Sequence, residues 1–246
     1  MAWSACVITS SSNPRLRLVR RLASRKQRER LGLFVCEGED LVQAALAAGV
    51  APAELLVDAE RPVEGLPEAE AVEPRLLAEV SALGHPPRVI GVFRLEDLPR
   101  LDPLSAPPVG LALWHVADPG NVGTLVRTAD GLGPAFLALS EQCADPTGPK
   151  ALRASAGSVF RVPTTTFNAA PGRRLALVAH GGKPLHEVDL AESTLFVLGA
   201  EREGLPADIV KTCDESVTIP LETGAESLNV AMTGSIALYE WRRRAR

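Results

Sequence analysis

The spacing of apolar residues along the chain predicts where helices and strands lie. After Asn13-Pro14, apolar residues recur at helical spacing among many basic ones, which predicts a basic amphipathic helix. Short apolar runs then alternate with helical patterns, which is typical of a small α/β domain. In this first part the predicted strands are 31–38, 54–57 and 89–93, and the predicted helices are 39–48 and 76–83.

The second part of the chain carries longer apolar runs. Its first segment, GLALWHVA at residues 110–117, is almost continuously apolar, as in a strand buried on both faces of a sheet. Buried strands that alternate with helices indicate a mainly parallel sheet, and ligands bind such sheets beside the carboxyl ends of the strands. Further strands are predicted at 136–139, 175–179 and 195–198, and helices at 122–132 and 228–241.

A proline-rich stretch separates the two parts. The sequence LPRLDPLSAPP, residues 98–108, contains four prolines, which predicts a stiff, extended linker. We therefore expect an α/β protein with two domains. A small α/β domain covers residues 1–98, a linker covers 99–108, and a domain with a mainly parallel sheet covers 109–246.

Composition excludes several classes of protein. The 246 residues are 46% hydrophobic and 23% charged, which fits a folded globular protein rather than a disordered one. No stretch reaches the roughly 18 apolar residues of a membrane span, and the N-terminus does not resemble a signal peptide. The four cysteines lie far apart in the sequence, and the four histidines do not have the spacing of metal ligands. We therefore expect no disulfide scaffold, no metal site, no membrane association and a reducing, cytoplasmic location.

The net charge of −4 hides an uneven distribution of charge. Residues 1–36 hold eight basic residues and one acid, and the last five residues hold four arginines. Such a run is often only a solvated helix face, but this excess favours contact with nucleic-acid phosphates, which suit the fork of arginine. Aromatic residues make up only 4% of the chain, so we expect recognition of shape and phosphates rather than stacking platforms like those of an RRM domain.

Three loops that follow predicted strands carry candidate chemistry, and the first is DPGNVGTLVRTAD at 118–130. Asn121 can cap the next helix, and Arg127 lies about one and a half turns into that helix. Gly120 and Gly123 allow the backbone to approach a ligand closely. A plain strand–turn–helix with a surface arginine is an equally good interpretation of these residues alone.

The other two loops are richer in charged and polar residues. LGAEREGLP at 198–206 packs charged residues between two glycines, which suits a ligand loop but also a solvated turn before a helix near Pro206. IPLETGAESLNVAMTGSIALYE at 219–240 begins where a strand ends and carries Ser227 and Asn229 before the last helix. Either residue could serve only as a helix N-cap.

Taken in order and at these distances, NVGTLVRTA, LGAEREGL and IPLETGAESLNVAMTGSIALYE resemble the three motifs of the SpoU branch of the SPOUT methyltransferases, also called the TrmH family. The resemblance covers the whole second part. The first part, with NPRLRLVRRL and FVCEGEDLVQAALAAG, is similar to the L30e-like substrate-binding domain of many members. One departure is AMTGS after Asn229-Val230, where members more often have residues such as SVAAG. We expect adjusted packing there rather than lost activity.

This resemblance implies a fold, an activity and an assembly. Members contain a deep trefoil knot near the C-terminus and transfer a methyl group from S-adenosylmethionine to a ribose 2′-hydroxyl of rRNA or tRNA. They are usually homodimers with sites near the subunit interface. The basic first part is similar to members that act on 23S rRNA. The alternatives are a tRNA methyltransferase and a non-catalytic RNA-binding protein of ribosome assembly.

The resemblance also assigns roles to residues of the three loops. Asn121 and Arg127 are expected at the reacting ribose, and Glu201 is expected to brace the site. Ser227 and Asn229 are expected to hold the arginine and a nearby phosphate or ribose. The residues expected to contact the cofactor are Leu198, Gly199, Glu201, Gly204, Ile219 and Leu228. The residues expected to bind RNA are Arg15, Arg17, Arg20, Arg21, Arg25 and Lys26.

Overall fold

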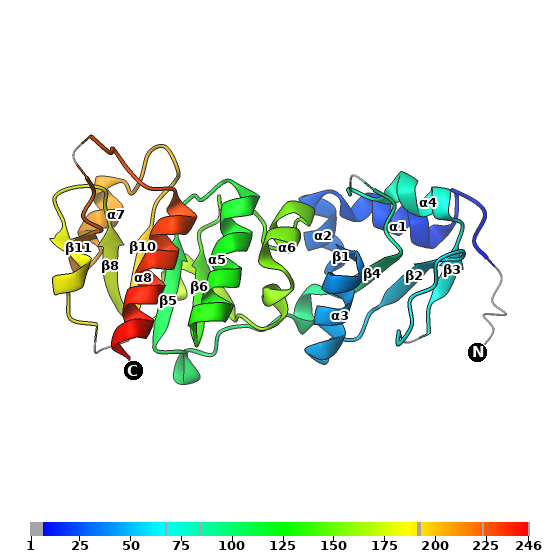
Figure 1. Ribbon diagram of the computed structural model, residues 1–246, viewed down its shortest axis with the longest axis horizontal. Coiled ribbons are helices and arrows are strands. Elements are labelled where there is room, and N and C mark those ends of the chain that lie inside the picture. Colours follow the sequence, from blue (N-terminus) through cyan, green and yellow to red (C-terminus); the bar gives the residue numbers. More distant parts are fainter. Residues whose placement is uncertain (1–6, 67, 84, 191–192, 223, 246) are drawn as a thin grey trace.

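The computed structural model describes residues 7–66, 68–83, 85–190, 193–222 and 224–245. Its strands form two sheets that lie one after the other along the long axis of the molecule (Figure 1). The helix α6 (Pro149–Ser155) lies between the two sheets. Within the described ranges, no helix combines the length and the apolar character that a membrane crossing needs.

The first sheet has four strands in the order β1-β4-β2-β3. The strand β4 is antiparallel to both β1 and β2, whereas β2 and β3 are parallel. The predicted α/β character of this part is therefore confirmed. The strands are β1 (Leu33–Glu37), β2 (Glu54–Asp58), β3 (Glu70–Val72) and β4 (Val89–Arg94). The helices are α1 (Pro14–Leu22), α2 (Arg25–Leu31), α3 (Glu39–Ala47) and α4 (Pro74–Val80).

The predicted basic helix proves to be two helices, α1 and α2. The helical run is interrupted at Ser24, which has an extended backbone and directly precedes the first residue of α2. Arg28 of α2 folds back and donates hydrogen bonds to the carbonyls of Leu22 and Ala23, over 2.9 and 3.0 Å. An α-helix leaves its last carbonyls without intrahelical partners, so this arginine caps α1. It is consequently buried rather than part of the basic surface.

The second sheet has seven strands in the order β7-β6-β5-β10-β8-β11-β9, and every pair of neighbours is parallel. The prediction of a mainly parallel sheet is confirmed. The trefoil knot stays a prediction. The strands are β5 (Val109–Leu113), β6 (Ala135–Leu139), β7 (Thr164–Thr166), β8 (Arg173–Leu177), β9 (Lys183–Pro184), β10 (Thr194–Leu198) and β11 (Glu215–Thr218).

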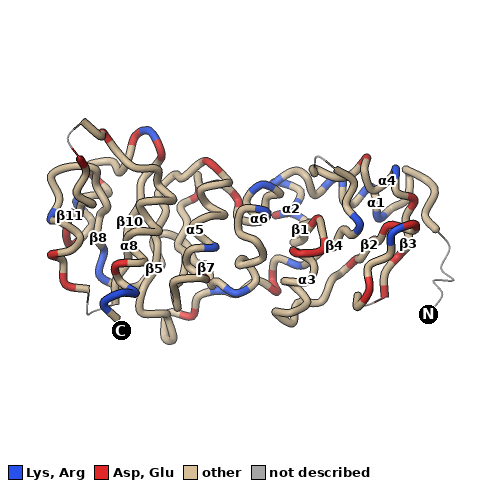
Figure 2. Tube along the Cα trace, viewed as in Figure 1, with Lys and Arg blue, Asp and Glu red and all other residues tan. Residues whose placement is uncertain are grey.

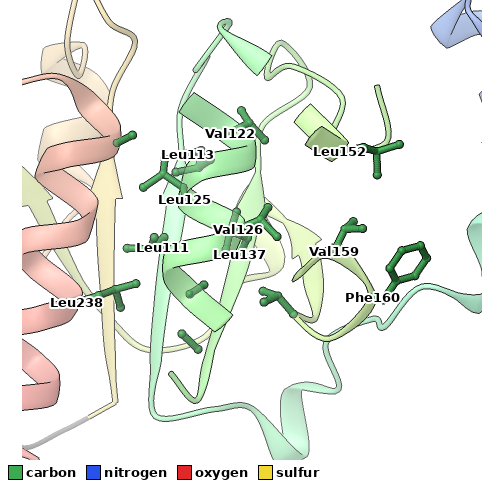
Figure 3. Packing of buried hydrophobic residues seen from close by; sticks show 14 of the residues in the cluster. Leu111, Leu113, Val122, Leu125, Val126, Leu137, Leu152, Val159, Phe160 and Leu238 are labelled. Carbon is green, nitrogen blue, oxygen red and sulfur yellow. The ribbon is translucent and has the colours of Figure 1, made fainter. Parts of the chain in front are cut away.

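Helices cover both faces of this second sheet. The long helices α5 (Pro119–Leu132) and α8 (Val230–Arg244) pack on one face, and the short α7 (Ala207–Lys211) lies on the other. Figure 3 shows Leu111 and Leu113 of β5 beside apolar side chains of α5. Ala112, between them in sequence, belongs to the core of the opposite face, as expected from the alternation of side chains along a strand. Short 3₁₀ helices occupy Leu95–Asp97, Pro103–Ser105, Ser158–Phe160, Phe167–Ala169 and Leu185–Glu187.

The two sheets are joined by a shared apolar core and by an ion pair. The ring of Phe160 lies 6.0 Å from that of Phe34 in β1 and 5.7 Å from that of Phe93 in β4. Arg28 donates to Asp145 of the second part through Nε and Nη2, over 3.0 and 2.5 Å. Both partners are largely buried, so the contact couples α2 to the loop after β6.

Candidate functional site

A cavity of about 340 Å³ opens at the carboxyl ends of the strands β8, β10 and β11. This is the edge of a parallel sheet at which ligands bind. The cavity brings together all residues expected to hold the cofactor, together with Ser227. They are Leu198, Gly199, Glu201, Gly204, Ile219 and Leu228.

The wall of this cavity depends on a tight reversal of the chain after β10. A side chain at Gly199 would overlap the backbone of Gly204 and Leu205. Gly204 has a φ of +66°, and its N–H donates to the carbonyl of Ala200 over 2.9 Å. Glycine at both positions therefore lets the loop fold back onto the strand end.

The lining of the cavity suits S-adenosylmethionine in both its apolar surface and its charge. Leu177, Leu198 and Ile219 form apolar surface of the kind that accommodates a purine ring. Glu203 and Glu226 join Glu201, so that carboxylates outnumber the single arginine of the lining. A ligand with a sulfonium, an ammonium and one carboxylate carries a net positive charge, which this surplus attracts.

The helix α5 begins three residues earlier than predicted, and its cap is not Asn121. Pro119 occupies the first turn, and the Asp118 side chain accepts a hydrogen bond from the backbone N–H of Asn121 over 3.0 Å. Proline suits this position because the first N–H groups of a helix need no intrahelical partner. The prediction of Asn121 as cap is therefore wrong. Its side chain is available for other contacts.

A chain of hydrogen bonds joins one residue from each of the three loops. Asn121 donates from Nδ2 to Oε1 of Glu201 over 3.0 Å and accepts at Oδ1 from Nδ2 of Asn229 over 3.2 Å. Asn229 in turn caps α8, since its Oδ1 accepts from the N–H groups of Ala231 and Met232. A carboxylate accepts only and a helix N-terminus donates only, so the two ends orient both amides.

Glu201 is the centre of this arrangement. Besides Asn121, its carboxylate accepts from the backbone N–H groups of Ala117 and Asp118, over 3.3 and 3.1 Å. Partial burial by itself would raise the pKa of Glu201, but the hydrogen bonds from Asn121 and from the backbone outweigh it and lower the pKa. The carboxylate is therefore charged at neutral pH and holds the loop after β5 against the loop after β10.

A lysine extends the same network at its outer side. Lys150 of α6 lies 2.8 Å from Asp118, the cap of α5. The hydrogen bond from Lys150, together with that from the Asn121 backbone, lowers the pKa of Asp118. The ion pair thus ties α6 to the start of α5.

Arg127 and Ser227 stand apart from these hydrogen bonds. Six residues of an α-helix turn through about 240°, so Arg127 leaves α5 on a different side from Asn121. It is exposed, and in the described part of the chain it forms no hydrogen bond or ion pair. Ser227 is exposed at the cavity. One chain therefore assembles Asn121, Glu201 and Asn229 but does not bring Arg127 to them.

Basic residues gather on α1 and α2, while the arginines at the end of α8 lie at the opposite end of the molecule (Figure 2). The residues expected to bind RNA differ in whether their side chains already have partners within the protein. Arg15 is held by Glu54 and Glu70, over 2.7 and 3.1 Å. Within the described residues, Arg17 and Lys26 are exposed and have no such partner.

The remaining three basic residues of this group have partners. Arg20 donates to the carbonyl of Ser11 over 2.7 Å and lies near Glu79. Arg21 reaches Gln27 only at 3.5 Å. Arg25 bonds Glu29 and the carbonyl of Cys143, over 2.8 and 3.0 Å. Arg17, Arg21 and Lys26 are therefore the most available to phosphates.

Several residues of the site were not predicted from the sequence. Asp118 and Lys150 were not singled out, although the pair Asp118-Pro119 is a recognisable helix start. The apolar wall at Leu177–Ala179 lay within a predicted strand, but its place beside β10 depends on the strand order. Among the described residues, no group of histidine, cysteine and carboxylate side chains could hold a metal ion.

Comparison with known proteins places both parts of the chain. The family described as the SpoU rRNA methylase family matches residues 108–239, and the MRM3-like substrate-binding domain matches residues 13–91. The 23S rRNA (guanosine(2553)-2′-O)-methyltransferase RlmP of Bacillus subtilis is 30% identical over 96% of this chain and 98% of its own. The 23S rRNA (uridine(2479)-2′-O)-methyltransferase of Streptomyces viridochromogenes is 30% identical over 89% of this chain and 85% of its own.

A solved structure agrees with these relatives. The crystal structure of the SpoU methyltransferase AviRb from Streptomyces viridochromogenes, in complex with the cofactor AdoMet, superimposes with a TM-score of 0.82. The two sequences are 27% identical, and the match covers 95% of this chain and 98% of that one. The likeness therefore extends over both sheets.

Proposed function

The chain belongs to the SpoU rRNA methylase family, and we propose from this that it transfers the methyl group of S-adenosylmethionine to a ribose 2′-hydroxyl of 23S rRNA. The observation that supports this most is the hydrogen-bonded trio of Asn121, Glu201 and Asn229 beside the cavity after β10. It draws one residue from each of the three motifs. Two relatives are named as 23S rRNA 2′-O-methyltransferases, one for a guanosine and one for a uridine.

The residues of the site supply positioning rather than strong acid–base groups. S-adenosylmethionine supplies an already activated methyl group. The loop from Leu198 to Gly204 would hold it against the strand ends, and Asn121 is tied to this loop by its hydrogen bond to Glu201. Alignment of two reactants for in-line attack contributes about 7 to 11 kcal/mol. We therefore assign the main effect of this site to orientation.

Arg127 is the residue we assign to the ribose and its phosphate. A guanidinium stabilises the oxyanion that develops as the hydroxyl loses its proton. Arginine is hard to deprotonate in proteins, so electrostatic stabilisation is the role we favour over that of general base. Ser227 and Asn229 would hold the phosphate or ribose nearby.

We propose a homodimer in which the exposed face of α8 forms part of the interface. Met232 and Tyr239 of this helix are 56% and 59% exposed, although both are large and apolar. Exposed apolar surface of this kind favours a partner. Arg127 leaves α5 on a different side from Asn121. In the dimer, Arg127 of a second copy would therefore complete the group formed by Asn121, Glu201 and Asn229. Sedimentation of the purified protein tests this, and a monomer at micromolar concentration would contradict it.

The first part is assigned to RNA binding. We propose that residues 1–98 form the substrate-binding domain, that 99–108 are the linker and that 109–246 form the methyltransferase domain. The match to the MRM3-like substrate-binding domain and the basic residues of α1 and α2 support this. A cytoplasmic location beside the ribosome follows from the same proposal.

Mapping of ribose methylation in total RNA tests the function directly. Cells with and without the gene are compared at every nucleotide, and the expected result is one site in 23S rRNA that loses its methyl group. A lost site in tRNA would instead support the tRNA alternative. Binding of labelled S-adenosylmethionine without any lost site would support the non-catalytic one.

A further inference from the structure

A column of three rings runs from the core towards the surface at the end of β5. Phe167 is 4% exposed and meets the indole of Trp114 edge to face, with ring centroids 5.1 Å apart. The indole stacks in turn on the imidazole of His115, at 4.3 Å and an interplanar angle of 16°. Trp114 and His115 are both half-buried. The imidazole therefore forms the outer end of the column.

The backbone anchors this column at the edge where the site lies. The N–H of Trp114 donates to the carbonyl of Leu198, a residue of the cavity, over 2.8 Å. The N–H of His115 donates to Oγ of Ser140 at the end of β6, over 2.9 Å. Two residues further on, Ala117 donates to Glu201. The rings are thus attached to the same strand ends as the proposed catalytic residues.

An unusual backbone conformation makes the stacking possible. Neighbouring side chains of a regular strand point to opposite faces of a sheet, so their rings cannot stack. His115 has a φ of 54°, a conformation that few residues other than glycine adopt. Strained conformations of this kind persist mainly at functional sites. Here the strain turns the imidazole onto the face of Trp114.

Stacking rather than hydrogen bonding holds the two rings. In the described part of the chain, the imidazole of His115 forms no hydrogen bond or ion pair. Nε1 of Trp114 is buried and has no hydrogen-bond partner either. Neither ring is therefore placed to serve a polar network of the fold.

We propose that His115, backed by Trp114, stacks on an unpaired base of the RNA close to the ribose that is methylated. This inference rests on the proposed function. Proteins that recognise unpaired RNA commonly stack its bases on aromatic and histidine side chains. A ring that is already fixed in its plane loses little freedom when a base stacks on it. The pair thereby adds a base contact to a chain that otherwise has few aromatic residues.

A general base is the other role that a histidine beside the site could serve. A catalytic imidazole usually has one nitrogen oriented by a hydrogen bond, so that the other is presented in a defined state. Among the described residues, His115 has no such partner, and its ring is aligned by its face instead. The geometry therefore favours stacking. A general base needs a ring nitrogen, whereas stacking needs only the face of the ring.

Two substitutions of His115 separate these roles. His115→Asn removes the ring and tolerates a positive φ, whereas His115→Phe keeps a ring without nitrogens. With tritiated S-adenosylmethionine and 23S rRNA transcribed in vitro, we expect His115→Asn to raise the KM for RNA about tenfold and His115→Phe to stay within about threefold of the unsubstituted protein. The control His186→Ala, at a histidine whose side chain is 62% exposed, should leave the KM for RNA unchanged.

Fluorescence gives a readout that does not depend on methyl transfer. In the double variant Trp3→Phe, Trp241→Phe, Trp114 is the single tryptophan, and we expect the same 23S rRNA to quench its emission only while His115 is present. Melting temperature and binding of S-adenosylmethionine show that each variant is folded. An unchanged KM in His115→Asn, or quenching that does not depend on His115, would overturn the proposal.

A loss of activity in His115→Phe as deep as that in His115→Asn, with a displaced pH profile, would also overturn it in favour of a general base. Failure of the proposed function has a different signature. The unsubstituted protein would then methylate no ribose of 23S rRNA, while quenching of Trp114 by RNA would still report stacking.

Discussion

Asn121 donates a hydrogen bond to Glu201 over 3.0 Å, although 80 positions separate the two residues in the sequence. The bond spans the carboxyl ends of two neighbouring strands, β5 and β10, and it orients the amide that also meets Asn229. The start of α5, the loop after β10 and the start of α8 are thereby held as one unit. Catalysis should therefore depend on this unit.

Removal of the charge on Glu201 should weaken catalysis. Glu201→Gln keeps one oxygen acceptor, but its NH2 group then faces the N–H of either Ala117 or Asp118, each of which needs an acceptor. We expect kcat to fall at least about tenfold, the effect of losing one hydrogen bond to a charged group. The measurement is steady-state methyl transfer to 23S rRNA. Glu96→Gln, at an exposed glutamate outside the site, serves as control, and equal activity of the two variants would contradict the role.

Loss of Arg127 should abolish transfer without affecting cofactor binding. Arg127→Ala removes a guanidinium that lies outside the cavity, so the Kd for S-adenosylmethionine should stay unchanged while kcat falls about 100-fold or more. Calorimetry and turnover measure the two effects separately. Arg127→Lys should recover part of the rate, and the exposed Arg94→Ala should keep it all. Turnover near that of the unsubstituted protein would refute the assignment.

RNA binding should depend on the exposed arginines of α1. The triple variant in which Arg17, Arg20 and Arg21 become glutamine should bind 23S rRNA more weakly, and the slope of log K against log salt should decrease by about 2 to 3. Arg15→Gln should change the slope less, because Glu54 and Glu70 already hold this guanidinium. Filter binding over a series of salt concentrations measures both. An unchanged slope in the triple variant would count against this surface.

The ion pair between Arg28 and Asp145 should be important for stability. The side chains are only 5% and 15% exposed, and Arg28 also caps α1. Arg28→Ala leaves a buried carboxylate without its partner, for which we expect a loss of about 3 kcal/mol in the free energy of unfolding. Urea denaturation measures it. The exposed Arg30→Ala is the matched control, and equal stability of the two variants would contradict the prediction.

Stability should fall in acid partly through Glu240. Hydrogen bonds from Arg243 and Arg244 lower the pKa of Glu240 from 4.5 to about 2. A group whose pKa is lower in the folded state stabilises the fold above its unfolded pKa, and this contribution is lost as pH falls through the folded value. Between pH 4.5 and 2 the unsubstituted protein should therefore lose about 1 kcal/mol more than Glu240→Gln, allowing for solvent screening. Parallel curves of unfolding free energy against pH would refute this.

Local patterns in the sequence determined much of the fold. The continuous apolar run at 110–117 and the later short runs predicted a parallel sheet, because a strand buried on both faces must be apolar on both. The position of the three loops after strands indicated where ligands bind, but the cofactor residues, all in the second and third loops, were implied by the resemblance of these loops to the motifs of a known family. The alternative interpretation of these loops as plain turns or helix caps was also confirmed in part. Asn229 does cap α8, and a helix does begin after Pro206.

Tertiary structure alone decided which of these residues meet. The order of the strands places β10 between β5 and β8, and this brings Glu201 to Asn121 and the wall at Leu177 to Leu198. Sequence spacing contains no such information, because parallel strands join through crossovers of varied length. The burial of Arg28 is a second example. As one of eight basic residues near the N-terminus it looked like part of an RNA-binding surface, but the packing of α2 against Asp145 makes it structural.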